Sequence, residues 1–312
     1  MRAARLHTIG GSLQLDSIDD PVANDGEVVV DMAYASVNPL DVWVTQGSVG
    51  GASANLPWTP GTEGTGFLDG QPVLVRGGGI GVARNGVYSE RAVVPDVAIT
   101  PLPSDRHMAQ IAALGVAGVT AWNAVHVHGQ ITSDDRVVVL GASGGVGSLA
   151  VQFAKATGAT VWGQSSNANK VDNVLADGAD HVVVGDHDGL AAKMSELSPT
   201  VILDALGGEY SPAAINALVA GGRLVVYGTS AGEMVEFNMR TLYRKGLTVS
   251  GYTGLIEPPA QAAKVMNTLL KMIEDGSIRI AIEQVGLGEA ADAHRRILER
   301  QVVGKLVIDI GR

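Results

Sequence analysis

The stretch VVVLGASGGVGSLAVQFAKATGATVWGQSSNANK (residues 137–170) decides the fold of this chain. Four apolar residues lead into a run of glycines, and an apolar, helix-like pattern follows from about Val146. Gly141, Gly144 and Gly147 lie at the predicted strand-to-helix turn, where missing Cβ atoms let a pyrophosphate approach the backbone. The helix N-terminus would offer that anion free N–H groups and the positive end of its dipole. The stretch therefore predicts a dinucleotide-binding turn.

The spacing is G-x-x-G-x-x-G rather than G-x-G-x-x-G, so the motif alone is also typical of a tight turn without a ligand. Its surroundings favour the dinucleotide, because apolar strands alternate with helix-length segments from this point on. The predicted strands are Val137–Leu140, Thr160–Gly163, His181–Val184, Val201–Leu206, Arg223–Gly228 and Leu247–Tyr252. Such alternation predicts a parallel six-stranded sheet covered by helices on both faces.

The regions on either side of this sheet predict a second domain. Before it, short apolar runs such as EVVVDMAYASV (27–37) and QPVLVRG (71–77) are broken by Gly, Pro and Asn, which is typical of an antiparallel β region. After it come two amphipathic helix patterns and a closing strand. At 312 residues two domains are expected. We predict an α/β chain in which residues 118–252 bind the nucleotide and residues 1–117 with 253–312 form the other domain.

Composition narrows the class of protein. Lys and Arg number 22 against 32 Asp and Glu, a net charge of −10 that would repel nucleic acid and anionic membranes. The chain has no cysteine, so neither a disulfide nor a thiolate metal cage is possible. The N-terminal region turns polar too soon for a signal peptide, and no run reaches about eighteen apolar residues. We predict a cytoplasmic protein with no nucleic-acid or membrane partner.

The end of the second strand indicates which dinucleotide binds. An NAD site of this kind normally has an Asp or Glu about twenty residues after the first glycine, but residues 141–171 contain no acidic residue. The donors available there are Ser165, Ser166, Asn167 and Lys170. Hydroxyls, an amide and an ammonium suit a 2′-phosphate that a carboxylate would repel. We therefore predict NADPH rather than NADH, with a solvated lysine on a helix face as the alternative interpretation of Lys170.

The order of the domains separates two dehydrogenase families. Short-chain dehydrogenases place the glycine turn near the N-terminus and need a Tyr-x-x-x-Lys pair, but here the turn comes late and none of the six tyrosines has a lysine four residues on. The arrangement resembles the medium-chain dehydrogenase/reductase superfamily. That resemblance implies a GroES-like β-rich catalytic domain, completed by the C-terminal segment, and a Rossmann domain with a six-stranded parallel sheet.

Three motifs narrow the resemblance to one branch. SVNPLDVWVTQG (36–47) and PWTPGTEGTG (57–66) are similar to the substrate-side signature of the zinc-free quinone oxidoreductases, the zeta-crystallin-like branch. GASGGVGSLAVQFAKATGA (141–159) is similar to the nucleotide turn of that branch. The resemblance implies NADPH-dependent reduction of quinones or α,β-unsaturated carbonyl compounds. In that chemistry the developing oxygen charge is delocalised and needs only hydrogen-bond donors.

The zinc-dependent alcohol dehydrogenases of the same superfamily differ at two places. They have a Cys where this chain has Ser36–Asn38, and a His where it has Thr62 before Glu63. His126 and His128 lie two apart near a predicted helix end, so their side chains would point to different sides. We expect no metal.

The resemblance also assigns site residues. It implies catalytic roles for Asn38, Asp41 and Trp43, with Asn38 also lining the cofactor. Asn38 and Asp41 have an alternative role as turn former and helix cap, and Trp43, where relatives often have Tyr, cannot relay a proton. The implied cofactor contacts are Thr120 near the phosphates, Gly141, Ala142, Ser143, Gly144, Gly145, Val146 and Gly147 in the turn, and Tyr227, Gly228 and Thr229 beside the nicotinamide.

The sequence also allows a different acceptor and a non-catalytic function. The loop GGGIGVARNGVYSE (77–90) is similar to acryloyl-CoA reductases, which indicates a thioester enone as an alternative acceptor. Gly185 and Asp186 stand where some relatives present a Tyr near the adenosine phosphate. A non-catalytic NADPH-binding protein, such as a crystallin or redox sensor, is a further alternative.

The last strand of the predicted sheet bears on the oligomeric state. LTVSGY (247–252) would leave an edge of unpaired backbone groups, which proteins usually cover or pair. In relatives the equivalent edge pairs across a two-fold axis, so we expect a homodimer.

Overall fold

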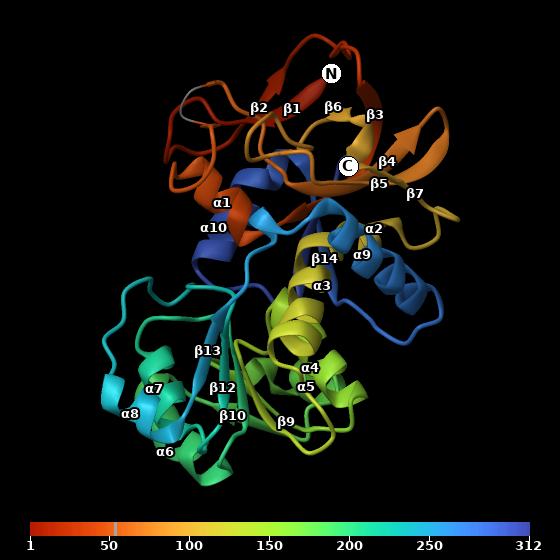
Figure 1. The fold of residues 1–312 in the computed structure, drawn as a ribbon. Coiled ribbons are helices and arrows are strands. Elements are labelled where there is room, and N and C mark those ends of the chain that lie inside the picture. Colours follow the sequence, from red (N-terminus) through yellow and green to blue (C-terminus); the bar gives the residue numbers. More distant parts are fainter. Residues whose placement is uncertain (53–54) are drawn as a thin grey trace. The chain divides into compact units, whose positions relative to one another are not determined.

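The computed structural model describes residues 1–52 and 55–312, which form two compact units (Figure 1). Unit 1 consists of Met1–Val116 and Asn267–Arg312, and unit 2 of Ala117–Met266. Two helices cross the boundaries between them, α3 (Gly115–Trp122) and α9 (Pro259–Glu274). Each unit has its own sheet.

Unit 1 is built on a seven-stranded sheet with the order β14-β15-β3-β4-β5-β7, in which β6 also pairs with β3. Its neighbouring strands are antiparallel except for the parallel pair β14 and β15. The strands are β3 (Glu27–Val37), β4 (Glu63–Leu68), β5 (Gln71–Arg76), β6 (Arg91–Pro95), β7 (Ile99–Pro101), β14 (Ile282–Gly286) and β15 (Lys305–Asp309), and β1 (Arg2–Arg5) and β2 (Gln14–Ser17) form a separate hairpin. The helices are α1 (Pro39–Thr45), α2 (Met108–Ala112), α10 (Ala290–Leu298) and the 3₁₀ turns η2 (Asp96–Ala98) and η6 (Leu287–Glu289).

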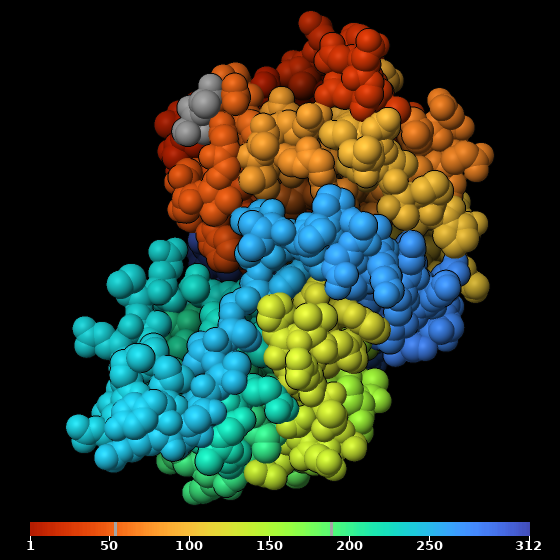
Figure 2. Space-filling view, in the orientation of Figure 1, coloured from red at the N-terminus to blue at the C-terminus, as the bar shows by residue number. Residues whose placement is uncertain are grey.

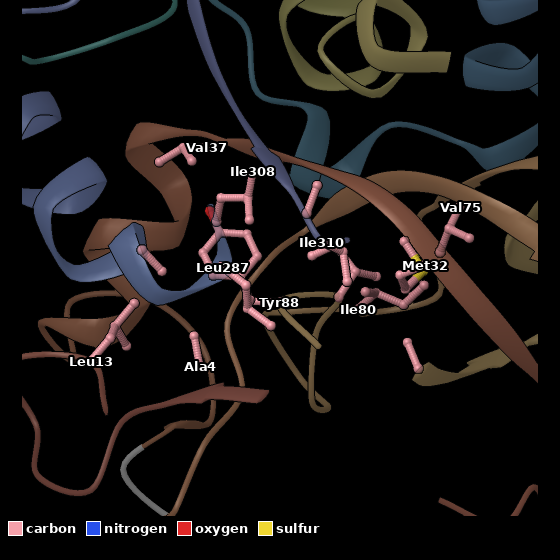
Figure 3. Packing of buried hydrophobic residues seen from close by; sticks show 14 of the residues in the cluster. Ala4, Leu13, Met32, Val37, Val75, Ile80, Tyr88, Leu287, Ile308 and Ile310 are labelled. Atoms are coloured by element: carbon pink, nitrogen blue, oxygen red, sulfur yellow. The ribbon is translucent and has the colours of Figure 1, made fainter. Parts of the chain in front are cut away.

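The core of unit 1 draws on both ends of the chain (Figure 3). Strand β3 contributes Met32 and Val37, and the C-terminal strand β15 contributes Ile308. Because β15 pairs antiparallel with β3 and its alternate residues face the core, the final strand belongs to the interior of the unit. Tyr88 lies in the same cluster and brings a hydroxyl into it.

Unit 2 is a parallel six-stranded sheet with the order β10-β9-β8-β11-β12-β13. The strands are β8 (Arg136–Leu140), β9 (Thr160–Ser165), β10 (His181–Val184), β11 (Val201–Asp204), β12 (Arg223–Val226) and β13 (Thr248–Gly251). The helices are α4 (Gly145–Ala156), α5 (Val171–Ala176), α6 (His187–Leu197), α7 (Tyr210–Ala217) and α8 (Met239–Lys245), with the π-helix η3 (Asn123–His128) and the 3₁₀ turns η4 (Ala168–Lys170) and η5 (Gly254–Ile256). The strand order reverses between β8 and β11, the place where open α/β sheets bind ligands at the carboxyl ends of the strands. The predicted Rossmann-type sheet is confirmed.

One edge of this sheet combines a free strand with apolar side chains. β13 is the last strand of the order and has no further strand beside it in the described chain. The neighbouring surface, light blue in Figure 2, contains α8 and β13. Its exposed apolar side chains include Met239, Tyr243 and Val249. An open strand edge and exposed apolar side chains thus occur together in this part of unit 2.

The helices are short throughout. α9, with 16 residues, is the longest in the described part of the chain, whereas a bilayer crossing needs about 20 apolar residues. Within residues 1–52 and 55–312 no helix has the length and apolar character to span a membrane.

Candidate functional site

The glycine turn lies between β8 and α4, at the carboxyl edge of the unit 2 sheet. Gly141 follows β8 with φ of +71°, a conformation that side chains rarely adopt. Gly144 is the N-cap of α4. An added Cβ at Gly147 would collide with the carbonyl oxygen of Gly141, so only glycine lets the helix pack this closely on the turn. The N–H groups of the first turn of α4 have no intrahelical acceptor, and the turn can therefore hold an anion.

The other residues of the turn are held by backbone hydrogen bonds. The N–H of Ala142 donates to the carbonyl of Gln164 at 2.9 Å, and that of Gly144 donates to the carbonyl of Gly141 at 3.0 Å. Ala142 is fully buried, whereas Ser143, Gly145 and Val146 are partly exposed. The structure thus brings all seven predicted turn residues together at one end of α4, with the exposed ones available to a ligand.

The four predicted 2′-phosphate donors lie in one loop after β9. The Ser165 hydroxyl is buried and donates to the Asn167 carbonyl at 3.2 Å. Ser166 and Asn167 are exposed, and the Asn167 side chain accepts the N–H of Asn169 at 2.9 Å. Lys170 is only 9% exposed, and burial lowers the pKa of its ammonium group. Ser166 and Asn167 are therefore the most accessible donors, with the Lys170 charge beside them at the end of η4.

Tyr227, Gly228 and Thr229 directly follow β12, at the same edge of the sheet. The Tyr227 N–H donates to the Asp204 carbonyl at 2.9 Å. The Tyr227 hydroxyl is buried with no hydrogen-bond partner in the described residues, and burial together with the nearby Asp204 charge raises its pKa. A Cβ on Gly228 would lie 2.7 Å from the Ala205 carbonyl oxygen, so this loop also packs against the end of β11. Thr120 lies half-buried in α3.

In unit 1, Asp41 is the centre of a buried hydrogen-bond network. Its Oδ2 accepts the Asn38 N–H at 2.7 Å and the Tyr88 hydroxyl at 3.2 Å, and its Oδ1 accepts the Thr62 N–H at 2.9 Å. Burial raises the pKa of Asp41 to about 6, against the opposing effects of these hydrogen bonds and of the Lys305 charge. Asp41 thus fixes the start of α1 to the segment that precedes β4.

The Asn38 side chain belongs to the same network and is 1% exposed. Its Nδ2 donates to Thr62 Oγ1 at 3.3 Å and to Glu63 Oε1 at 3.1 Å, while its Oδ1 accepts from the Lys305 ammonium. Glu63 Oε2 in turn accepts the N–H of Val116 at 2.7 Å, in the first turn of α3. Trp43, the third predicted catalytic residue, is half-buried on α1. Asn38 and Asp41 therefore lie together in the interior of unit 1, where their polar atoms are already hydrogen-bonded.

Comparisons with known proteins extend over the whole architecture. A family model described as zinc-binding dehydrogenase matches residues 145–271. The quinone oxidoreductase of Sus scrofa is 29% identical over 99% of this chain and 97% of its own length, and an acrylyl-CoA reductase of Ruegeria pomeroyi is 27% identical over 95% and 93%. Two solved structures are each 27% identical to this chain. An NAD-dependent alcohol dehydrogenase has a TM-score of 0.90 over 100% of both chains. The quinone oxidoreductase of Thermus thermophilus, described with its NADPH complex, has a TM-score of 0.86 over 99% of this chain and 100% of that one.

These comparisons support the predicted resemblance to the quinone-oxidoreductase-like branch of the medium-chain dehydrogenase/reductase superfamily. The fold class predicted from the sequence is confirmed. The protein is accordingly an oxidoreductase.

Two of the histidines predicted not to bind metal have aromatic neighbours. His126 packs on Trp122 with ring centroids 4.2 Å apart, and burial lowers its pKa. The His128 ring lies 5.6 Å from that of Tyr252. Among the side chains that the structure describes, those of residues 1–52, 55–187 and 190–312, no three His, Cys, Asp or Glu are grouped closely enough to hold a metal.

Sequence reasoning missed several polar residues of the two networks. Asp204 ends β11 and accepts the N–H groups of Leu206 and Gly207, at 2.7 and 3.0 Å, and the Ser211 hydroxyl at 2.7 Å. An acidic residue that ends an apolar strand, as in VILD, was the available signal for it. Lys305 and Gln164 gave no such signal, because each is one polar residue within an otherwise ordinary strand pattern.

Proposed function

We propose that this oxidoreductase transfers hydride from NADPH to a quinone or an α,β-unsaturated carbonyl compound, without zinc. The main support is that two loops at the ends of neighbouring strands suit NADPH. The loop before α4 is the glycine turn, and the loop after β9 has hydroxyl, amide and ammonium donors and no acidic residue. The quinone oxidoreductases among the relatives support the acceptor class, and the NADPH complex of the Thermus enzyme supports the cofactor.

The residues of unit 2 suit a dinucleotide along the carboxyl edge of the sheet. The first turn of α4 would hold the pyrophosphate through its backbone N–H groups. Tyr227–Thr229, after β12, would border the nicotinamide, and Thr120 would lie near the phosphates. Their placement at the ends of β8, β9 and β12 supports this assignment, since ligands bind there in sheets of this order.

The loop after β9 would select the 2′-phosphate. Ser165, Ser166 and Asn167 supply neutral hydrogen-bonding groups, and Lys170 supplies a positive charge. A charge-assisted hydrogen bond is worth about 1.5–3 kcal/mol, and no carboxylate of residues 141–171 opposes it. This loop would therefore bind NADPH more tightly than NADH.

On the acceptor side we assign roles to Asn38, Asp41 and Trp43. The cofactor would supply the hydride, and the reduced acceptor would develop negative charge on oxygen. The Trp43 indole is a hydrogen-bond donor suited to that charge, whereas the Asn38 amide could donate to it only after giving up one of its bonds to Thr62 and Glu63. Asp41 would keep Asn38 in place, because it accepts the Asn38 N–H at 2.7 Å.

The test is a turnover assay that follows nicotinamide absorbance with NADPH and a panel of quinones, simple enones and enoyl thioesters. Faster turnover of the quinones and simple enones is the expected result. A preference for the thioesters would favour the alternative acceptor, which residues 77–90 and the Ruegeria relative support. Binding of NADPH without turnover of any acceptor would indicate a non-catalytic binding protein.

We also propose a homodimer formed through the edge of unit 2. The open edge of β13 supports this because it can pair with a second strand, and the exposed apolar residues of α8 support it because they are costly to leave in water.

A further inference from the structure

Gln164 lies at the end of β9, and its side chain joins two loops of the candidate cofactor edge. It is 1% exposed. Its Oε1 accepts the N–H of Gly141 at 3.0 Å, and its Nε2 donates to the carbonyl of Gly185 at 2.8 Å. The Gln164 carbonyl also accepts the N–H of Ala142 at 2.9 Å. One residue thus ties the loops that follow β8 and β10 to the end of the strand between them.

This arrangement decides which backbone groups of the turn can face an anion. The Gly141 N–H is already used by Gln164, so the anion is left to the free N–H groups at the start of α4. α4 rests on Gly141, because Gly147 packs against the Gly141 carbonyl. The position of Gly141 therefore sets the position of the N–H groups that would meet a pyrophosphate.

We propose that Gln164 is a positioning residue for the cofactor pyrophosphate, a role that rests on the dinucleotide site proposed above. Its amide holds the glycine turn in the binding conformation before the cofactor arrives. Glycines are the most flexible residues of a chain, so a turn without this amide would have to be ordered by the cofactor itself. The cost of that ordering would appear as weaker binding.

Only ligands that contain a pyrophosphate should depend on Gln164. NADPH, NADH and ADP-ribose all contain the pyrophosphate, so each should bind more weakly when Gln164 is changed. Adenosine 2′-monophosphate has no pyrophosphate and would bind only in the loop that contains Ser166 and Lys170. A general loss of structure would weaken all four ligands together.

Two substitutions and one control test this. Gln164→Met keeps the length of the side chain and removes both polar groups, while Gln164→Asn keeps the amide but shortens it by one methylene. Gln152→Met is the matched control, because Gln152 is a partly buried glutamine of α4 whose amide donates to the carbonyl of Ser148 in the same helix. Ligand affinities are measured by calorimetry, thermal unfolding is recorded for each variant, and kcat is measured at saturating NADPH.

Both Gln164 variants are expected to bind NADPH, NADH and ADP-ribose about tenfold more weakly, which corresponds to about 1.4 kcal/mol. Affinity for adenosine 2′-monophosphate, and kcat at saturation, should stay within about twofold of wild type, as should all values for Gln152→Met. Unchanged pyrophosphate-ligand affinity in folded variants, equal losses with all four ligands, or failure of both variants to fold would overturn the proposal. If the wild-type protein binds neither NADPH nor NADH, the proposed function itself fails, which is a separate result.

Discussion

Replacement of Lys305 by methionine tests the buried network of unit 1. Lys305 is 5% exposed, and its ammonium donates to the Val37 carbonyl at 3.2 Å and to Asn38 Oδ1. Burial lowers its pKa, while the charges of Glu63 and Asp41 oppose that shift. Lys305→Met keeps most of the side-chain volume but leaves the two buried carboxyl groups without their cation.

Breaking a direct buried ion pair typically costs about 3–5 kcal/mol. Lys305 acts on Asp41 and Glu63 through its charge, and both carboxyl groups keep their hydrogen bonds, so a loss of about 3 kcal/mol, at the lower end, is expected. We therefore expect the free energy of unfolding to fall by about that amount at pH 8. The loss should shrink at lower pH. The pKa of Asp41 is raised to about 6 from 3.8, so this group stabilises the fold most below pH 3.8 and its contribution is lost as the pH rises through 6. Without Lys305 its pKa would rise further, and the wild-type advantage at pH 5 would be smaller by about 1 kcal/mol or more.

Urea unfolding followed by tryptophan fluorescence measures this, since Trp58 is 1% exposed in the core of unit 1. Lys271→Met is the control, an exposed lysine of α9 in the same unit, with an expected change within about 0.5 kcal/mol. A Lys305→Met variant as stable as this control, or one whose loss is the same at pH 5 and pH 8, would refute the role of Lys305 as counter-ion.

Four further results are expected. Lys170→Ala should raise KM for NADPH about tenfold and leave KM for NADH nearly unchanged, whereas equal losses with both cofactors would mean that Lys170 supports the fold. Burial lowers the pKa of His294 to about 4, so its neutral form stabilises the fold above pH 6.5 and this contribution is lost as the pH falls towards 4. In His294→Leu the free energy of unfolding should therefore fall by about 3 kcal/mol less than in wild type between pH 6.5 and pH 4. Parallel pH curves for the two proteins would contradict this. Elemental analysis should find no stoichiometric zinc, and activity should survive chelation; about one zinc per chain with chelator-sensitive activity is the opposite result. Light scattering at micromolar concentration should give a dimeric mass, which Val249→Asp on β13 should reduce, and a monomeric wild type would count against the proposed interface.

The unit 2 sheet could be predicted because its signals are local. Each apolar strand and each following helix can be recognised within about fifteen residues, and all six predicted strands are present. Some ends differ by one or two residues: β8 begins at Arg136, β9 continues to Ser165 and β13 spans Thr248–Gly251, whereas β11 and β12 stop early, at Asp204 and Val226. There the sequence stays apolar for one or two residues more, while the backbone has already left the sheet to form the loops of the ligand edge.

The buried networks could not be predicted, because they depend on long-range pairing. Lys305 and Asn38 are 267 positions apart, and only the antiparallel pairing of β15 with β3 brings them together. A lysine at the start of an apolar strand is usually exposed, so its sequence context is misleading. Gln164 is similar, because its bonds to Gly141 and Gly185 depend on the geometry of two loops rather than on a local pattern.

The charge of Lys305 bears directly on the question of zinc. Zinc-dependent relatives have a Cys in place of Ser36–Asn38 and a His in place of Thr62. In this chain, the Asn38 amide and the Thr62 hydroxyl hydrogen-bond to each other at 3.3 Å. The Lys305 ammonium, bonded to Asn38 Oδ1, already places a positive charge beside them. An amide and a hydroxyl therefore stand where zinc would prefer a thiolate and an imidazole, and the ammonium offsets part of the negative charge of Asp41 and Glu63 that would otherwise attract a cation. The same ammonium polarises the Asn38 amide and makes its N–H groups better donors. Both N–H groups already donate, to Thr62 and Glu63, so the stronger bonds hold Asn38 in this network, and the proposed donation to a quinone or enone oxygen would require one of them to be released.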